Sequence, residues 1–275
     1  MEAGPDASGW KNRSRHRRLS ARPLPEKTSR LKASTYEKPA VLAEYLAFHY
    51  LEPSQLLPPG APLLRSIDNF PSACARLLLR HAPKQASRAL DLGCAVGRSS
   101  FEIARRIPEV IGIDLSKSFI RAAKKIQEQG QLRFNLLEER TITRSCLANF
   151  HPGAPRKHTT FRTGNALDLP HGIGSFDLVL AANLIDRLPD PKRFLKKILP
   201  SLVKPGGIVL LTSPYTWSSE FTPRSRWLKD SFLTIRMELR SSFRLLHRQD
   251  LPFLLREHRR KFQFTFADAT IWQRL

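Results

Sequence analysis

The most constraining feature of this chain is an apolar segment that breaks at two glycines and is followed by a second strand ending in an acid. Residues 89–101 read ALDLGCAVGRSSF, and the break contains Asp91, Gly93 and Gly97. The next apolar segment, VIGID, ends at Asp114. Glycines allow the backbone to approach a nucleotide-like ligand, and an acid ending the next strand can accept hydrogen bonds from both ribose hydroxyls. This pair of segments predicts a nucleotide-like cofactor at the ends of two parallel strands.

The spacing of the glycines separates two classes of such cofactor. Dinucleotides favour G-x-G-x-x-G, because their pyrophosphate sits on a helix N-terminus. Here the spacing is Gly93-x-x-x-Gly97, and Asp91 stands two residues before the first glycine. That arrangement suits a cofactor without phosphate and with a cationic sulfonium, S-adenosylmethionine. The loop therefore favours a methyltransferase over an oxidoreductase.

Apolar and amphipathic segments alternate on both sides of this loop. Strands are predicted at residues 87–93, 109–114, 159–166, 176–183 and 208–214, and helices at residues 38–51, 71–81, 97–107, 116–130 and 192–199. Ser116 and Asp190 are predicted to cap two of these helices. Apolar strands that alternate with helices indicate an α/β fold of the Rossmann-like type, with a parallel sheet covered on both faces. After Pro214 the pattern weakens until residues 261–275, where alternating phenylalanines indicate an antiparallel strand.

Charge and composition divide the chain into two parts. The formal net charge is +22, and residues 1–34 are rich in Lys and Arg but have no apolar periodicity, so we expect a disordered basic tail. Residues 35–275 form the predicted methyltransferase domain, with residues 35–85 as an N-terminal helical lid. A second basic cluster, REHRRK, lies at residues 256–261. Such charge leaves nucleic acid open as a partner and organelle targeting open as a role for the tail.

The cysteines and the hydropathy pattern argue against other classes of protein. Cys74, Cys94 and Cys146 are scattered without C-x-x-C spacing, which indicates neither a disulfide framework nor a metal site. No apolar run reaches the roughly 18–20 residues that span a bilayer. No secretory segment follows the first methionine. We therefore expect a cytoplasmic protein without a metal and without a membrane partner.

The ends of the predicted strands supply the candidate cofactor residues. Ligands of open parallel sheets bind at the carboxyl ends of the strands, so Asp91, Gly93, Gly97 and Asp114 are expected to lie at one site. Asn165 and Ala166 follow the third strand, where the Asn165 amide could contact the adenine amine or serve only as a turn residue. The two glycines have an alternative role as well, since both could simply allow a tight turn and close helix packing.

Several longer strings carry a resemblance to a known family. Residues 89–217 resemble class I S-adenosylmethionine-dependent methyltransferases. More narrowly, DLGCAVGRSSFE, VIGIDLSKSFI, FDLVLAANLIDRLPDP and PGGIVLLTSPYTW are similar to the C-terminal methyltransferase domain of ovothiol-biosynthesis enzymes. EYLAFHY upstream and PFLLREHRRKFQ downstream agree with that family, so the resemblance covers residues 36–274.

The resemblance implies a mostly parallel seven-stranded sheet and a specific reaction. The expected reaction is methylation of an imidazole ring nitrogen of 4-mercaptohistidine (5-thiohistidine), which gives ovothiol. In that family an iron-dependent sulfoxide synthase domain precedes the methyltransferase domain, whereas residues 1–34 stand in its place here. The chain therefore resembles either a stand-alone version of this domain or a terminal fragment, and for a stand-alone version a separate sulfoxide synthase is the expected protein partner. An enzyme that methylates RNA or another small molecule is the alternative, although ANLIDR stands where amino-methylating nucleic-acid enzymes carry Asn/Asp-Pro-Pro-aromatic.

The acceptor is expected to lie beyond the fourth and fifth strands. Asn183 and Asp186 are the predicted catalytic residues, and Arg187, Tyr215 and Trp217 the predicted substrate-binding residues. Arg187 could pair with the substrate carboxylate, and a flat aromatic side chain could stack on its ring. The competing interpretations are that Arg187 is a helix-surface charge and that Trp217 belongs to the core. His49 and Tyr50 could close the pocket from the lid or pack against apolar neighbours.

Overall fold

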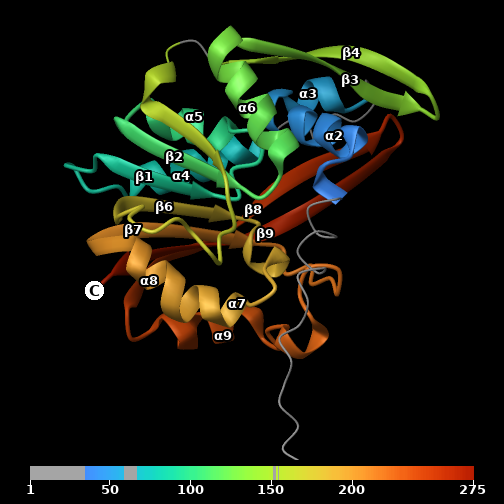
Figure 1. Ribbon diagram of the computed structural model, residues 1–275. Coiled ribbons are helices and arrows are strands. Elements are labelled where there is room, and N and C mark those ends of the chain that lie inside the picture. Colours follow the sequence, from blue (N-terminus) through green and yellow to red (C-terminus); the bar gives the residue numbers. More distant parts are fainter. Residues whose placement is uncertain (1–34, 59–66, 151–152, 154) are drawn as a thin grey trace, which may run out of the picture.

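A seven-stranded sheet with the order β5-β2-β1-β6-β7-β9-β8 runs through the computed structural model (Figure 1). Five neighbouring strands are parallel: β1 (Arg88–Leu92), β2 (Glu109–Asp114), β5 (Thr159–Thr163), β6 (Phe176–Ala182) and β7 (Val203–Ser213). β9 (Lys261–Arg274) is antiparallel to β7 and to β8 (Phe243–His258). The predicted Rossmann-like, mostly parallel seven-stranded sheet is confirmed, as is the antiparallel strand at the C-terminal end of the sequence.

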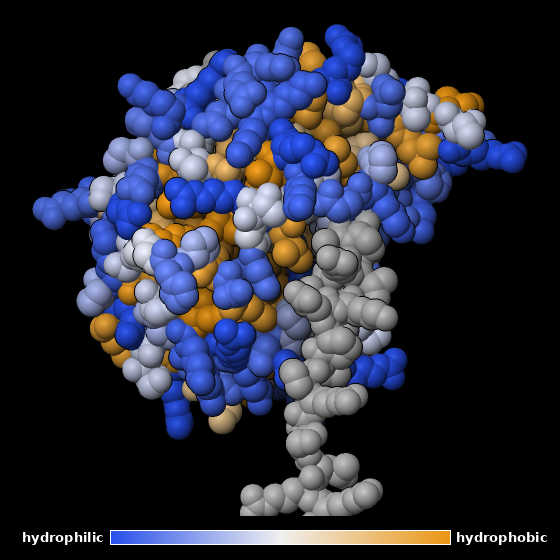
Figure 2. Space-filling view, viewed as in Figure 1, coloured by the Kyte–Doolittle hydropathy of each residue, from blue (hydrophilic) through white to orange (hydrophobic). Residues whose placement is uncertain are grey.

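The structure describes residues 35–58, 67–150, 153 and 155–275. The basic tail predicted for residues 1–34 lies outside the described residues. Among those that are described, no helix is long and apolar enough to cross a membrane. The face of the molecule in Figure 2 is mostly hydrophilic at its rim, and hydrophobic residues show towards its centre.

Helices cover both faces of the sheet because its central strands are apolar on both sides. Val179 and Ala181 of β6 belong to a core shared with the helical segments between residues 191 and 202 and with α9 (Ser231–Leu239). Leu178 and Leu180 of the same strand face the opposite side and pack with α4 (Phe70–Arg80) and α5 (Arg98–Ala104). Alternate residues of one strand therefore hold two helical layers, as the apolar run predicts.

The helix ends follow local capping rules. The Ser116 hydroxyl accepts a hydrogen bond from the Phe119 N–H at the start of α6 (Lys117–Gln129), and Gly130 ends that helix with a φ of 77°. Asp190 accepts from the Arg193 N–H at the start of α7 (Pro191–Arg193). Both predicted caps are confirmed. The chain then continues through a π-helical segment, Phe194–Ile198, into α8 (Leu199–Leu202).

Three parts of the fold do not follow from the sequence pattern. They are the hairpin of β3 (Gln131–Glu139) and β4 (Ile142–Asn149), helix α9, and the long edge strand β8. The hairpin packs against α2 (Pro39–Tyr50) and α6, and α2 also contacts β8. The short α3 (Pro53–Leu56) follows α2. These contacts hold α2 across the carboxyl ends of the parallel strands, which places its side chains above the predicted cofactor loop.

Candidate cofactor and acceptor site

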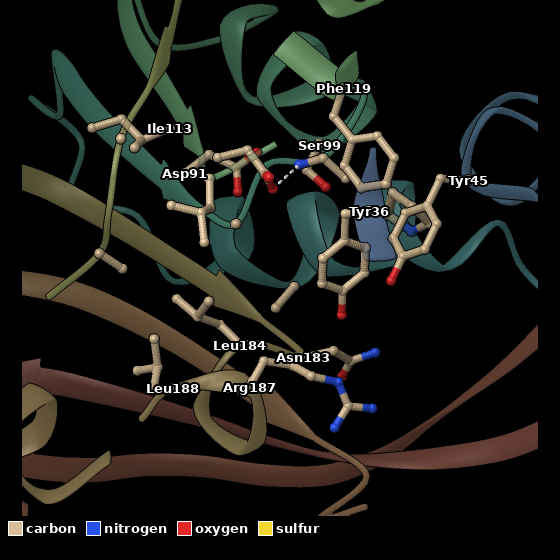
Figure 3. Close-up of a pocket in the computed structure, with 18 of the residues that line it drawn as sticks. Tyr36, Tyr45, Asp91, Ser99, Ile113, Phe119, Asn183, Leu184, Arg187 and Leu188 are labelled. Carbon is tan, nitrogen blue, oxygen red and sulfur yellow. Dashed lines mark hydrogen bonds between the residues drawn. The ribbon is translucent and has the colours of Figure 1, made fainter. Parts of the chain in front are cut away.

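A cavity of about 280 Å³ lies between the carboxyl ends of the parallel strands and the N-terminal segment (Figure 3). Its floor contains the ends of β1, β2 and β6, and its roof contains Tyr36 and Tyr45. Of the predicted residues, the cavity brings together Asp91, Gly93, Asp114, Asn165, Ala166, Asn183 and Arg187. Phe70 and Pro71, at the start of α4, close one side of it.

The two glycines of the loop have different roles. Both have positive φ angles, 74° at Gly93 and 89° at Gly97, which side chains rarely adopt. Gly93 lines the cavity, and a Cβ atom there would lie 3.3 Å from the Leu184 side chain. A Cβ atom at Gly97 would lie 2.8 Å from the Phe161 ring, behind the loop. The close contact of Gly97 with Phe161 of β5 favours the alternative interpretation, close packing, whereas Gly93 leaves its backbone open to the cavity.

Asp114 ends β2 and presents its carboxylate to the cavity. One oxygen accepts from the Ala95 N–H at 2.9 Å and the other from the Ser116 N–H at 2.8 Å. Each carboxylate oxygen can accept a further bond, so the group retains capacity for two hydroxyls of a ligand. Burial raises its pKa to about 6, while these backbone hydrogen bonds act in the opposite direction.

Asp91 lies deeper, at the end of β1, and is 1% exposed. Its carboxylate accepts from the Ser100 hydroxyl at 2.7 Å. Burial raises the pKa of Asp91 to about 7, partly offset by the bond to Ser100. Two carboxyl groups with raised pKa values thus line the same end of the cavity, as is common at functional sites.

Asn165 and Ala166 line the cavity beside β2. The Asn165 side-chain oxygen accepts from the Leu167 N–H at 2.9 Å, and its backbone carbonyl accepts from the Asp168 N–H at 2.9 Å. Asn165 is therefore a turn residue, the second of its two predicted roles. Its side-chain oxygen retains a lone pair that could accept from an adenine amine.

Asn183 and Arg187 follow β6 at the other end of the cavity. Asn183 has a φ of 49°, and its side-chain oxygen accepts from the Thr212 hydroxyl at 2.9 Å. The Arg187 guanidinium donates to the Asp186 carboxylate at 3.1 Å and to the Thr216 carbonyl at 2.8 Å, and it lies over the Phe221 ring. Arg187 is thus oriented by neighbours and is not a free surface charge.

The structure does not bring Asp186, Tyr215 or Trp217 into the cavity lining. The Asp186 side chain is completely buried and holds Arg187 and the Thr216 hydroxyl. The Tyr215 hydroxyl donates to Asp268 at 2.8 Å, and the Trp217 indole donates to Ser231 at 3.1 Å, next to the core. The physical reason for Tyr215 is the pairing of β9 with β7, which places Asp268 opposite Ser213 and within reach of the Tyr215 hydroxyl. Trp217 is held instead by Ser231 at the start of α9.

Aromatic side chains from the N-terminal half form the rest of the wall. Tyr36, Tyr45 and Phe119 form one cluster, with ring centroids 4.7–5.9 Å apart. They are not among the site residues predicted from the sequence, because aromatic residues at helical spacing are typical of a core. The only signal was the density of rings in YEKPAVLAEYLAFHY.

His49 and Tyr50, the two lid residues considered in the sequence, have different surroundings in the structure. His49 lines the cavity, and its Nδ1 atom is buried without a hydrogen-bond partner among the described residues. Burial, aided by Arg98, lowers the pKa of His49 to about 3, so its imidazole is neutral. The Tyr50 hydroxyl instead donates to the Val96 carbonyl at 2.7 Å and fastens α2 to the cofactor loop.

The donor set fits S-adenosylmethionine. Asp91, Gly93 and Asp114 bring two carboxylates and an open backbone to one end of the cavity, and among the described residues no cationic side chain lines that end. A pyrophosphate would be repelled by the two acids, whereas a ribose diol and a sulfonium cation suit them. Asp114 would hold the ribose, Asn165 and Ala166 would border the adenine, and Gly93 would give the backbone access.

Comparison with known proteins agrees with this assignment. Residues 90–209 match a family model described as a methyltransferase domain. The chain is 25% identical to ajmaline N-methyltransferase of Rauvolfia serpentina over 173 residues, which cover 62% of this chain and 51% of that protein. It is 28% identical to the ubiquinone biosynthesis O-methyltransferase of Coxiella burnetii over 123 residues, which cover 45% of this chain and 42% of that protein. The chain spans about half the length of the curated relatives that it matches.

Solved structures show the same fold at low sequence identity. Magnesium protoporphyrin IX methyltransferase from Synechocystis PCC 6803 superposes with a TM-score of 0.56 at 13% identity, over 93% of this chain and 100% of that one. The cyclase SpnF gives a TM-score of 0.56 at 15% identity, over 88% and 94% of the two chains. Because a methyltransferase and a cyclase share this fold, the reaction has to be argued from the site.

Proposed function

We propose that this class I S-adenosylmethionine-dependent methyltransferase methylates an imidazole ring nitrogen of 4-mercaptohistidine, the last step towards ovothiol. The observation that carries the proposal is one cavity with carboxylates at its cofactor end and an anchored guanidinium at its other end. The strings DLGCAVGRSSFE, NLIDRL and SPYTW add support through their resemblance to the ovothiol family. Two curated relatives named as N-methyltransferases, for ajmaline and norajmaline, favour nitrogen as the atom that receives the methyl group.

The size of the cavity favours a small acceptor over a macromolecule. Its volume of about 280 Å³ lies near the lower end of the range for small-molecule pockets. Tyr36 and Tyr45 cover it from the N-terminal side, so a base or side chain of a polymer would have to displace the lid. Because the cofactor would occupy part of this volume, the space left favours a small acceptor, and a flat ring can stack on the aromatic walls.

The residues of the chain orient the acceptor and exclude water. When bound, S-adenosylmethionine supplies an electrophilic methyl group on its sulfonium. Methyl transfer then needs an oriented nucleophile in a dry pocket, and holding two reactants in line lowers the barrier by several kcal/mol. Arg187 suits an anionic group of the acceptor, and Asn183, which lines the same cavity, can hydrogen-bond the acceptor ring.

The thiol of the proposed substrate makes this orientation necessary. A thiolate is intrinsically a better nucleophile than an imidazole nitrogen, so the site has to hold the sulfur away from the line of transfer. Plain histidine lacks the sulfur, and a pocket with donors for it would leave those donors unsatisfied. The loss is about 1–3 kcal/mol for each buried group. We therefore expect histidine to be a poor substrate.

The decisive experiment is a methyl-transfer assay with isotope-labelled cofactor. The protein is incubated with 4-mercaptohistidine, histidine or total RNA, and the product is analysed by mass spectrometry with fragmentation. We expect label on a ring nitrogen of 4-mercaptohistidine and little on histidine. Methyl on sulfur, or equal rates with histidine, would refute the acceptor assignment. Transfer to RNA alone would support a nucleic-acid enzyme, which the net charge of +22 favours.

We also propose a protein partner for this reaction. The proposed substrate carries a sulfur on the ring of histidine, and the resemblance to the ovothiol family suggests an iron-dependent sulfoxide synthase as the catalyst that supplies it. Co-purification of the two proteins, or labelled ovothiol formed from histidine and cysteine only when both are present, tests this step.

A further inference from the structure

The roof of the cavity brings two tyrosine hydroxyls towards the same cation. Tyr36 precedes α2 and Tyr45 lies within it, and both hydroxyls point to the side of the cavity where Arg187 and Asn183 lie (Figure 3). Burial raises the pKa of both tyrosines, so their hydroxyls stay protonated and can donate. The two tyrosine hydroxyls and the Arg187 guanidinium, which lies more than 140 residues further along the sequence, thus meet at one end of the cavity.

Hydrogen bonds of Glu37 and Ser118, together called the latch, hold this part of the roof against the start of α6. The Glu37 carboxylate accepts from the Lys117 N–H at 2.6 Å and from the Ser118 N–H at 3.2 Å, at the start of α6. The Ser118 hydroxyl donates to the Tyr36 carbonyl at 3.0 Å. A carboxylate at a helix N-terminus is stabilised both by free N–H groups and by the helix dipole. Glu37 therefore fixes the position of its neighbour Tyr36.

The latch is contiguous with the cofactor site. The Ser116 hydroxyl donates to Glu37 at 3.0 Å, and the Ser116 N–H donates to Asp114 at 2.8 Å. One residue thus connects the roof to the acid that is expected to hold the ribose. A change at Glu37 should therefore act on the acceptor end through Tyr36, while the two backbone donors to Asp114 remain in place.

We propose that Arg187, Tyr36 and Tyr45 form a subsite for the carboxylate of the acceptor, and that Glu37 is its positioning residue. This subsite deepens the proposed function and rests on it for the identity of the acceptor. A guanidinium with a planar set of donors recognises a carboxylate, and hydroxyl donors complete the shell around its oxygens.

The charges of the cavity favour an anion over a cation at this subsite. Among the described lining residues, Arg187 is the one side chain with a positive charge, since His49 is neutral. Asp91 and Asp114 lie at the cofactor end. An ammonium next to Arg187 would be repelled in a site with little water, and the aromatic faces of Tyr36 and Phe119 would not offset that repulsion.

Binding of two matched probes tests the subsite without any methyl transfer. Imidazole-4-acetate and 4-methylimidazole differ only in the carboxylate, and histamine carries a CH2–NH3⁺ group in its place. Their affinities for the protein saturated with S-adenosylhomocysteine are measured by ligand-observed NMR. We expect imidazole-4-acetate to bind at least about tenfold more tightly than the other two, as charged hydrogen bonds imply. Equal affinities, tighter binding of histamine, or no binding of imidazole-4-acetate would overturn the proposal.

Variants then assign the contacts. Arg187→Gln and Tyr36→Phe should each weaken imidazole-4-acetate about tenfold and leave 4-methylimidazole unchanged. Glu37→Ala should act in the same direction, and Glu37→Gln should restore part of the affinity because an amide oxygen still accepts from the α6 N–H groups. Arg244→Gln, at an exposed position that bonds Gln273, is the matched control. A Glu37→Ala protein that keeps wild-type affinity for imidazole-4-acetate would remove Glu37 from the proposal.

The outcomes separate this inference from the proposed function. If the carboxylate preference is found but 4-mercaptohistidine is not methylated, the subsite stands and the acceptor assignment fails. If 4-mercaptohistidine is methylated but the probes bind alike, the reaction stands and the subsite fails.

Discussion

Ala95 donates its backbone N–H to the Asp114 carboxylate at 2.9 Å, although its φ of 46° is one that residues with a Cβ atom rarely adopt. The left-handed conformation costs roughly 1–2 kcal/mol for such a residue. The loop retains it because the turn between Gly93 and Gly97 has to aim this N–H at the end of β2. The strained backbone of Ala95 thus helps to hold the Asp114 carboxylate in place at the cofactor site.

We expect Ala95→Gly to stabilise the protein, because glycine adopts positive φ without steric cost. Glycine also loses more entropy on folding, so the net rise in the free energy of unfolding should be at most about 1 kcal/mol. Ala95→Val should have the opposite effect, since a branched side chain disfavours this conformation further. Urea unfolding measures both changes. A destabilised Ala95→Gly protein would show that the φ at this position carries no strain.

Asp114→Asn should weaken binding of S-adenosylhomocysteine by about 1–3 kcal/mol. The amide keeps the size of the side chain but loses the charge and one acceptor oxygen. Its NH2 group, itself a donor, then faces the N–H of either Ala95 or Ser116. Isothermal titration calorimetry measures the affinity. Asp250→Asn, at an exposed position of β8, is the matched control and should bind like the wild type. Unchanged affinity in Asp114→Asn would place the ribose elsewhere.

The parallel part of the fold could be predicted because each of its strands is a short apolar run with a turn residue at its end. β1, β2 and β6 are short apolar runs with a glycine, an acid or an asparagine at the end, and the α6 cap at Ser116 is a local signal. The pattern of Phe262, Phe264 and Phe266 likewise identified β9. In each case the period of the hydrophobic residues and the turn chemistry agree with the final structure.

The other elements depend on partners far away in the chain. β8 is the edge strand of the sheet, contains Pro252, and takes its conformation from pairing with β9. The roof residues Tyr36 and Tyr45 are unrecognisable as site residues until α2 is placed over the strand ends. Conversely, Tyr215 was expected in the acceptor site, but the pairing of β7 with β9 brings Asp268 within reach of its hydroxyl. Tertiary contacts, which a single sequence does not encode locally, decide these positions.

Cofactor affinity should depend on pH through the buried acids. Burial raises the pKa of Asp114 to about 6 and that of Asp91 to about 7. A raised acid pKa means that the carboxyl group is protonated below that value, and a protonated group accepts from hydroxyls less well. Affinity for S-adenosylhomocysteine should therefore be full at about pH 8 and fall as the pH is lowered through these two values.

Two variants make the pH profile diagnostic. Asp114→Asn should lose the lower step of the profile, because its side chain does not titrate. Glu37→Gln should move that step to lower pH, since the negative charge of Glu37 contributes to the raised pKa of Asp114. Calorimetry across the pH range measures both. A wild-type profile that stays flat between about pH 8 and pH 5 would exclude Asp114 as a titrating ligand group.

Asp186 should act on the acceptor through Arg187. Its side chain is completely buried and pairs with the Arg187 guanidinium at 3.1 Å, outside the cavity lining. Asp186→Asn, which keeps the shape and one acceptor oxygen, should raise the KM for the acceptor and leave kcat nearly unchanged. Asp186→Ala removes the buried carboxylate but leaves the partly exposed Arg187 guanidinium its bond to the Thr216 carbonyl, so it should lower the free energy of unfolding by only about 1–3 kcal/mol.

Steady-state kinetics and urea unfolding check these effects together. Thr216→Val is the matched control, because it removes the hydroxyl that Asp186 and Arg187 share and keeps the ion pair; its effect on KM should be smaller. The catalytic role expected for Asp186 from the sequence makes a different prediction. If Asp186→Asn lowers kcat and changes the pH profile of kcat while KM stays constant, the carboxylate takes part in the reaction itself, and the positioning role argued from its burial is wrong.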